Sequence, residues 1–141
     1  MQDYDLVIVG GGLVGGSLAC ALAGSGLRVA VIEAATPQHP AAGAAPPPAQ
    51  YDERVIALSL GSRRIFSGMG IWPALAAAAE PIRRVHVSDR GRPGFAHLDA
   101  DDEGVEALGY VAPARAIGAA LEGCLASAEG VELLRPARLA G

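Results

Sequence analysis

The pattern of apolar and polar positions in the first part of the chain predicts elements in the order strand, turn, helix and strand. Residues 4–9 (YDLVIV) are rich in β-branched side chains and predict a strand, and two leucines four residues apart predict a helix over 14–23. The glycines of 24–26 end this helix. Residues 28–32 (RVAVI) are continuously apolar, as in a strand buried on both faces of a parallel sheet. The pattern therefore predicts one βαβ unit of about 30 residues.

The rest of the chain predicts seven further elements, because its periodicity changes between helical and strand-like. They are a helix over 59–69, a short alanine-rich helix from 72 to about 81, hairpin strands at 84–88 and 95–99, a strand at 107–111, a helix over 113–128 and a strand at 131–135. Pro113 suits the first turn of its helix. The last strand is expected to join the first sheet, which makes the fold class α/β.

A glycine-rich turn, GGGLVGG at 10–16, separates the first strand from the first helix. Gly10 permits a sharp exit from the strand, Gly12 lacks the Cβ that would block a pyrophosphate, and Gly15 lets the helix pack closely on the sheet. The N–H groups of the first helical turn, around Leu13 and Val14, then face the phosphates with the positive end of the helix dipole. The turn predicts a phosphate site that needs no lysine.

The spacing beyond the turn extends this dinucleotide-binding fingerprint. Small and apolar residues recur at the fitting positions, namely Ala19, Leu22, Gly26 and Val29. Glu33 ends the second strand, where its carboxylate can accept hydrogen bonds from the ribose hydroxyls of an adenosine and would repel a 2′-phosphate. The fingerprint thus predicts an adenine dinucleotide, disfavours NADP, and leaves FAD and NAD open.

Composition narrows the class of protein and of partner. The 141 residues are 51% hydrophobic and 18% charged, which is typical of a soluble globular domain. A net charge of −4 without a Lys/Arg-rich block argues against a nucleic-acid partner. Residues 13–32 contain several glycines and Arg28 and follow no basic segment, so neither a membrane span nor a signal peptide is predicted.

The remaining chemistry-bearing side chains are assigned ordinary roles. Cys20 and Cys124 lack metal-ligand spacing and are expected to be buried and reduced, which suits a cytoplasmic setting. No metal site is predicted. His39 falls in a Pro/Ala-rich loop over 34–50. Solvated or half-exposed positions are expected for Arg63, Arg64, His86, His97 and the acidic run 99–106, whereas Trp72 is expected in the core or an interface.

After the loop, the motif D-x-R-x-x-A-L-S (Asp52 to Ser59) together with the fingerprint resembles the flavin-dependent aromatic hydroxylases. Residues 85–95 (VHVSDRGRPGF) and 107–111 (ALGYV) look most like the branch of 2-polyprenyl-6-methoxyphenol hydroxylases of ubiquinone synthesis. The resemblance implies a Rossmann-like FAD-binding domain in two parts, 1–81 and 107–141. It also implies that the hairpin over 82–106 belongs to an interleaved substrate domain.

The resemblance also implies cofactor contacts at two arginines. Arg54 matches the family's arginine that reaches the FAD, and its planar guanidinium suits anionic and carbonyl groups. Asp52 and Glu53 are expected to orient the loop or to cap the following helix. Where the family has V-E-N-R or a related polar sequence, this chain has VAPAR at 111–115, which leaves Arg115 as the candidate.

The activity implied by the resemblance is hydroxylation of a polyprenyl phenol by an FAD-dependent monooxygenase that consumes NAD(P)H and O2. The family's Asp-Gly and Gly-Asp cofactor motifs are missing, so an N-terminal part of such an enzyme is expected, without assigned catalytic residues. A peripheral site at the inner membrane or a lipid-presenting partner would supply the substrate; the oligomeric state is not predicted. Another Rossmann FAD or NAD oxidoreductase and an inactive nucleotide-binding module stay open as alternatives.

Overall fold

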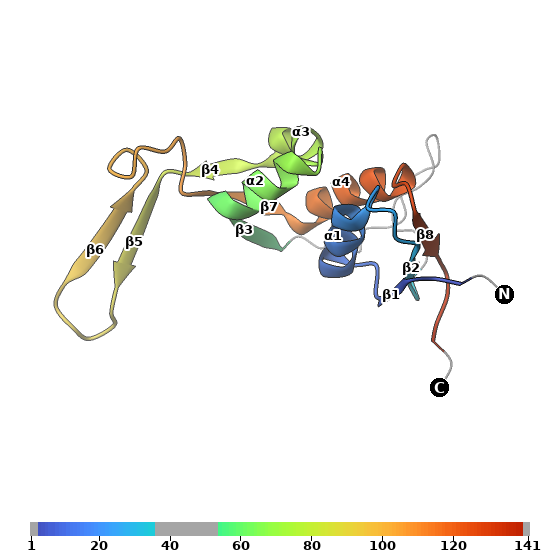
Figure 1. Cartoon of the computed structure of the whole chain (residues 1–141). Helices are drawn as coiled ribbons and strands as arrows, with labels where there is room; N and C mark the ends of the chain where they lie inside the picture. The colour runs from blue at the N-terminus through green and yellow to red at the C-terminus, as the bar shows by residue number, and fades with distance from the viewer. Residues whose placement is uncertain (1–2, 36–53, 140–141) are drawn as a thin grey trace, which may run out of the picture. The chain divides into compact units, whose positions relative to one another are not determined.

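The computed structural model describes residues 3–35 and 54–139 (Figure 1). The chain forms two compact units, one made of Met1–Glu53 with Ala114–Gly141 and the other of Arg54–Pro113. The predicted domain bounds at 81/82 and 106/107, and the assignment of the hairpin to a substrate domain, stay predictions.

The first unit contains a parallel sheet in the order β1-β2-β8. Its strands are β1 (Leu6–Val9), β2 (Val29–Ile32) and β8 (Val131–Leu134), and Val29 of the central strand pairs with Leu6 on one side and Val131 on the other. The first three residues of β2 are buried, which explains their unbroken apolar sequence. The α/β class and the membership of the last strand in the first sheet are confirmed.

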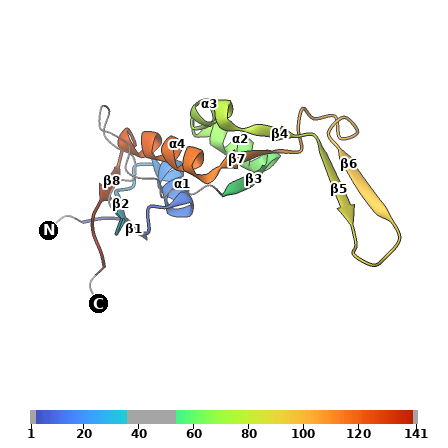
Figure 2. The same ribbon diagram turned by 180° about the vertical axis from the view of Figure 1, so that it is seen from behind.

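Two helices of the first unit, α1 (Leu13–Leu22) and α4 (Ala114–Ala126), lie side by side in both views (Figures 1 and 2). Small residues make this packing close: a Cβ on Gly16 would lie 3.7 Å from a methyl carbon of Leu121. Each buried leucine or isoleucine of α4 contributes about 1.5–3 kcal/mol to folding. The helix begins at Ala114 and Pro113 ends the preceding strand, so the prediction of Pro113 inside the first turn is wrong by one residue.

The second unit is built on an antiparallel sheet in the order β3-β7-β4. The strands are β3 (Val55–Ser59), β4 (Glu80–Ile82) and β7 (Gly109–Pro113), and the helices are α2 (Leu60–Gly68), α3 (Trp72–Leu75) and the 3₁₀ turn η1 (Ala76–Ala78). Strands β3 and β4 were not predicted. The second predicted helix therefore ends before residue 81, because the chain turns into β4 there.

The predicted hairpin is confirmed as β5 (Arg84–Ser88) paired with β6 (Phe95–Asp99), with His86 directly opposite His97. Gly91 and Gly94 of its turn have φ of +82° and +124°, which favour glycine. Within residues 3–35 and 54–139, no helix is long and apolar enough to cross a membrane.

Candidate dinucleotide site

The glycine turn begins where β1 ends. Gly10 has φ of +102°, which a side chain would strain, and its N–H donates to the carbonyl of Ile32 at 2.8 Å. The bond ties the turn to the carboxyl end of β2. The chain then reverses direction and enters α1 at Leu13.

The space beside Gly15 is filled, whereas the space beside Gly12 is open. A Cβ at Gly15 would lie 1.9 Å from the carbonyl oxygen of Gly10, so only glycine permits this contact between helix and turn. A Cβ at Gly12 would have no heavy atom within 4 Å. The close packing predicted for Gly15 is therefore present, and Gly12 faces open space; their contacts with a cofactor stay predictions.

The amino end of α1 leaves backbone donors before its hydrogen-bonded ladder. Gly12 is the N-cap without a side-chain cap bond, and the first i→i−4 bond runs from Gly16 N–H to Gly12 at 2.7 Å. The N–H groups of Leu13, Val14 and Gly15 thus precede the ladder. No acidic side chain occupies the first turn of α1. This is the arrangement that binds phosphate groups.

Glu33 follows β2 and lies against the glycine turn. Its Oε1 accepts from Ala35 N–H and its Oε2 from Gly11 N–H, both at 2.7 Å. The Ala35 and then the Gly11 hydrogen bonds hold the pKa of Glu33 below its usual range, with a smaller contribution from the charge of Arg135. Glu33 is therefore ionised at neutral pH. The two hydrogen bonds to ionised Glu33 stabilise the folded chain, and this stabilisation is fully present above the pKa that Glu33 has in the unfolded chain. Because the pKa of Glu33 in the folded chain is the lower of the two, the stabilisation is lost as the pH falls through that value.

Arg135 stands just beyond β8, the neighbour of β2. Its Nη1 lies 2.9 Å from Oε1 of Glu122 on α4, and both side chains are partly buried. The backbone of Glu33 is hydrogen-bonded to the residues around Arg135. The N–H of Glu33 donates to the carbonyl of Leu134 at 3.0 Å, and its carbonyl accepts from the N–H of Ala137 at 2.8 Å. Sequence reasoning missed Arg135, because only the strand order reveals its neighbour.

The structure brings together the glycine turn and Glu33, as the fingerprint requires. Arg115 is exposed in the first turn of α4, in the same unit. Arg54 is exposed just before β3, in the second unit. Their roles toward a cofactor stay predictions. Asp52, Glu53 and His39 lie outside the described residues.

Cys20 is buried in α1, as predicted, whereas Cys124 of α4 is only half-buried, contrary to the prediction. Burial and the neighbouring Cys124 thiol raise the pKa of the Cys20 thiol to about 12. Cys20 therefore stays protonated and unreactive at neutral pH.

The second unit holds two clusters of side chains. The Arg63 guanidinium lies 5.5 Å from the ring centre of Trp72, so the expectation of a simply solvated arginine is wrong, and Trp72 packs edge-on against Tyr110. On the hairpin, His86 Nδ1 and His97 Nε2 are 2.8 Å apart and both side chains are exposed. Among the described residues, no group of three or more His, Cys, Asp or Glu side chains is placed to hold a metal ion.

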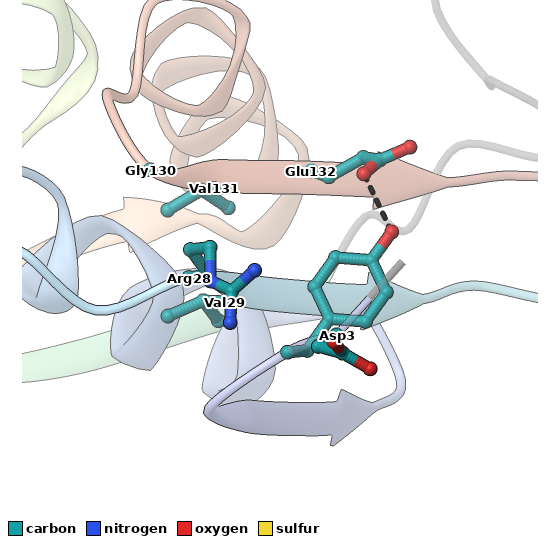
Figure 3. Close-up of a pocket in the computed structure, with 7 residues that line it drawn as sticks. Asp3, Arg28, Val29, Gly130, Val131 and Glu132 are labelled. Atoms are coloured by element: carbon teal, nitrogen blue, oxygen red, sulfur yellow. Dashed lines mark hydrogen bonds between the residues drawn. The ribbon is translucent and has the colours of Figure 1, made fainter. Parts of the chain in front are cut away.

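A hollow of about 530 Å³ opens at the amino ends of the parallel strands, opposite the ends that carry the glycine turn and Glu33 (Figure 3). The Tyr4 hydroxyl donates to Glu132 beside it, which raises the pKa of Tyr4. The lining comes from the amino ends of the strands: Asp3, Tyr4, Arg28, Val29, Gly130, Val131 and Glu132. Ligands of parallel α/β sheets bind at the carboxyl ends, so this hollow is not the dinucleotide site.

Solved structures show which fold the chain shares. The flavin-dependent monooxygenase PieE, solved with FAD and substrate, gives a TM-score of 0.64 at 19% identity over 92% of this chain and 23% of that chain. The anhydrotetracycline hydroxylase OxyS of Streptomyces rimosus gives 0.67 at 22% identity over 96% and 25%. The chain therefore has the fold of about a quarter of a flavin-dependent monooxygenase and of a hydroxylase.

Sequence relatives identify the branch. Ubiquinone hydroxylase UbiL of Rhodospirillum rubrum is 38% identical over 135 residues, which are 96% of this chain and 30% of the relative. The 3-demethoxyubiquinol 3-hydroxylase of Escherichia coli is 36% identical over 111 residues, 78% of this chain and 27% of the relative. No family model matches the chain. The resemblance seen in the motifs is confirmed: the chain is a relative of the ubiquinone hydroxylases and spans less than a third of the length of these two.

Proposed function

We propose that this chain forms the FAD-binding part of an aromatic-ring monooxygenase that hydroxylates a polyprenyl phenol in ubiquinone biosynthesis, with NAD(P)H and O2 as co-substrates. The names of the sequence relatives support the reaction and the pathway. The structural neighbour solved with FAD supports the cofactor. The observation that carries the proposal is the uncapped amino end of α1 beside the pinned carboxylate of Glu33.

The residues of the first unit fit an adenine dinucleotide. The backbone N–H groups of Leu13 and Val14 would hold the pyrophosphate, because they precede the helical ladder and carry the positive end of the helix dipole. The open space beside Gly12 admits the phosphates. Glu33 would accept from the ribose hydroxyls with the lone pairs that its two backbone bonds leave unused. FAD, when bound, supplies the redox chemistry.

Two arginines complete the proposed cofactor contacts. Both Arg54 and Arg115 are exposed side chains, and a guanidinium keeps its charge throughout the physiological pH range. We assign them to anionic or carbonyl groups of the cofactor. The resemblance of the D-x-R motif supports Arg54, whereas Arg115 is supported by its position in the first turn of α4.

The substrate sets where the whole enzyme works. A polyprenyl chain partitions into lipid, so the proposed setting is the cytoplasmic face of the inner membrane or a partner protein that presents the lipid. Nucleic acid is not a proposed partner, since the net charge is −4.

A flavin titration tests the cofactor assignment. Purified chain is mixed with FAD, and bound flavin is measured by its visible absorption and by quenching of its fluorescence. We expect one FAD per chain, no comparable binding of NAD, and weaker FAD binding for Glu33→Gln, which keeps the shape of the side chain but removes its charge. A chain that retains no FAD when the nucleotide is in excess contradicts the proposal.

Turnover separates an enzyme from a binding module. The FAD-loaded chain is given NADH or NADPH in air, with and without a prenylated phenol, and NAD(P)H consumption and hydroxylated product are measured. Product formation that depends on the phenol supports the full reaction for this chain. FAD binding with no NAD(P)H oxidation identifies the chain as a nucleotide-binding part only.

A further inference from the structure

Gly11 occupies the position that the dinucleotide fingerprint leaves free for any residue. In this chain its backbone N–H donates to Oε2 of Glu33 at 2.7 Å. The acceptor is an ionised carboxylate, and hydrogen bonds to charged groups are stronger than neutral ones. Position 11 therefore holds the carboxylate that the proposed function assigns to the ribose.

The space around Gly11 is filled by the same glutamate. A Cβ built on Gly11 would lie 3.2 Å from Cβ and 3.3 Å from Oε2 of Glu33. The φ of Gly11 lies outside the left-handed region, so its backbone would accept an alanine. A methyl group on Gly11 would therefore be crowded by Glu33, whereas a methyl group on Gly12 would meet open space.

The main chain of Glu33 has little freedom to relieve that contact. Its N–H donates to Leu134 and its carbonyl accepts from Ala137, which ties the residue to the segment after β8. Glu33 Cβ moves only with this backbone, so a methyl group on Gly11 would push the glycine turn and Glu33 apart by a few tenths of an ångström. This displacement would lengthen the bond from Gly11 N–H to Oε2 and move the carboxylate from the ribose position. Arg135, paired with Glu122, is the charged side chain whose field acts on Glu33.

We propose that Gly11 is a specificity-determining residue, whose N–H and lack of a side chain hold the Glu33 carboxylate in the position that accepts from a free ribose 2′-hydroxyl and repels a 2′-phosphate. This inference rests on the proposed function, because it assigns the ribose to Glu33. It makes the middle glycine of the turn a positioning residue for discrimination between adenosine and its 2′-phosphate.

The test uses two probes that differ only in the 2′-phosphate, AMP and adenosine 2′,5′-bisphosphate. Their dissociation constants are measured by calorimetry for the chain, for Gly11→Ala and for the control Gly123→Ala, whose Cβ would have open space in α4. We expect Gly11→Ala to weaken AMP binding about tenfold, as for loss of one hydrogen bond to a charged group. The preference for AMP over the bisphosphate should shrink, while the control stays within about twofold for both probes.

A double-mutant cycle shows whether the effect acts through Glu33. In a Glu33→Gln background, Gly11→Ala should change AMP binding by less than about twofold, because the bond it removes is already weakened. An undiminished loss in that background would overturn the inference, since it would place the effect in the phosphate contacts. An unchanged preference in Gly11→Ala also overturns it.

The contact itself is measured without any nucleotide. In an NMR pH titration, the Gly11 amide shift should follow the ionisation of Glu33, with a midpoint below the usual pKa of about 4.3, and should not titrate in Glu33→Gln. A Gly11 amide that ignores this titration overturns the inference even if variants bind poorly because they misfold. If the chain binds neither probe nor FAD while the amide titrates, the proposed function fails and the specificity role falls with it.

Discussion

Gly12 and Gly15 show how differently two glycines of one turn are constrained. At Gly15 a Cβ would overlap the carbonyl oxygen of Gly10, whereas at Gly12 it would touch nothing. Gly15→Ala should therefore lower the free energy of unfolding by about 1–3 kcal/mol, the usual cost of overpacking. Gly12→Ala should leave it unchanged within about 1 kcal/mol, because φ of −66° suits alanine.

Urea denaturation of both variants measures this difference, and FAD titration accompanies it. Under the proposed function, Gly12→Ala stays folded but binds FAD more weakly, because its methyl group occupies space meant for the phosphates. Equal stability of the two variants would contradict the packing argument, and normal FAD binding by Gly12→Ala would contradict the phosphate assignment.

The residues of the fingerprint could be predicted from sequence because their constraints are local. Gly10, Gly15 and Glu33 are recognised by spacing along one βαβ unit, and the structure brings them together. The hydrogen bond from Gly11 to Glu33 and the charge of Arg135 that acts on Glu33 could not be predicted in this way. They depend on a side-chain rotamer and on the strand order, neither of which is written in the periodicity.

At the scale of elements, Ser59 links a strand to a helix. It is the last residue of β3 and the N-cap of α2, where its Oγ accepts from Ser62 N–H at 3.1 Å. Ser59→Ala should cost about 1 kcal/mol of stability, and Ser59→Asp should restore the acceptor. Ser67→Ala is the matched control, because the Ser67 hydroxyl donates to Arg63 within the helix and caps nothing.

Thermal unfolding of the three variants measures the cap. The melting temperature should fall for Ser59→Ala and recover for Ser59→Asp, with Ser67→Ala close to the unchanged chain. A Ser59→Ala variant as stable as Ser67→Ala would show that the cap bond contributes no net stability.

Elements with local signals were predictable, and those with distant partners were not. The βαβ unit and the hairpin follow from periods of 3.6 and 2 within short windows. Strand β3 was missed because its partner is far along the chain, with Val55 opposite Pro113. Strand β4 was missed because it has only three residues and contains Pro81. Proline is found in strands mainly at the edge of a sheet, where β4 lies.

At the scale of the whole molecule, the proposed nucleotide site belongs to one unit. Glycine turn, Glu33 and Arg135 all lie in Met1–Glu53 with Ala114–Gly141. ADP at about 100 times its dissociation constant should stabilise that unit by up to about 2.7 kcal/mol. Hydrogen exchange should therefore slow in β1, α1, β2 and β8, and stay unchanged in the β5–β6 hairpin.

Glu33→Gln provides the control for this experiment, because it should need more ADP for the same protection. Equal slowing in hairpin and parallel sheet would argue that ADP stabilises the entire chain as one cooperative body. No slowing in either unit at saturating ADP would argue against the nucleotide site.

The strand order β1-β2-β8 also dictates an order of assembly on the ribosome. Central strand β2 is complete at Ile32, yet its second neighbour begins only at Val131. All three strands of the antiparallel sheet, by contrast, have been synthesised once Pro113 is reached. During translation the unit of Arg54–Pro113 can therefore fold first. One edge of β2 meanwhile stays without its second neighbouring strand for almost a hundred residues of synthesis.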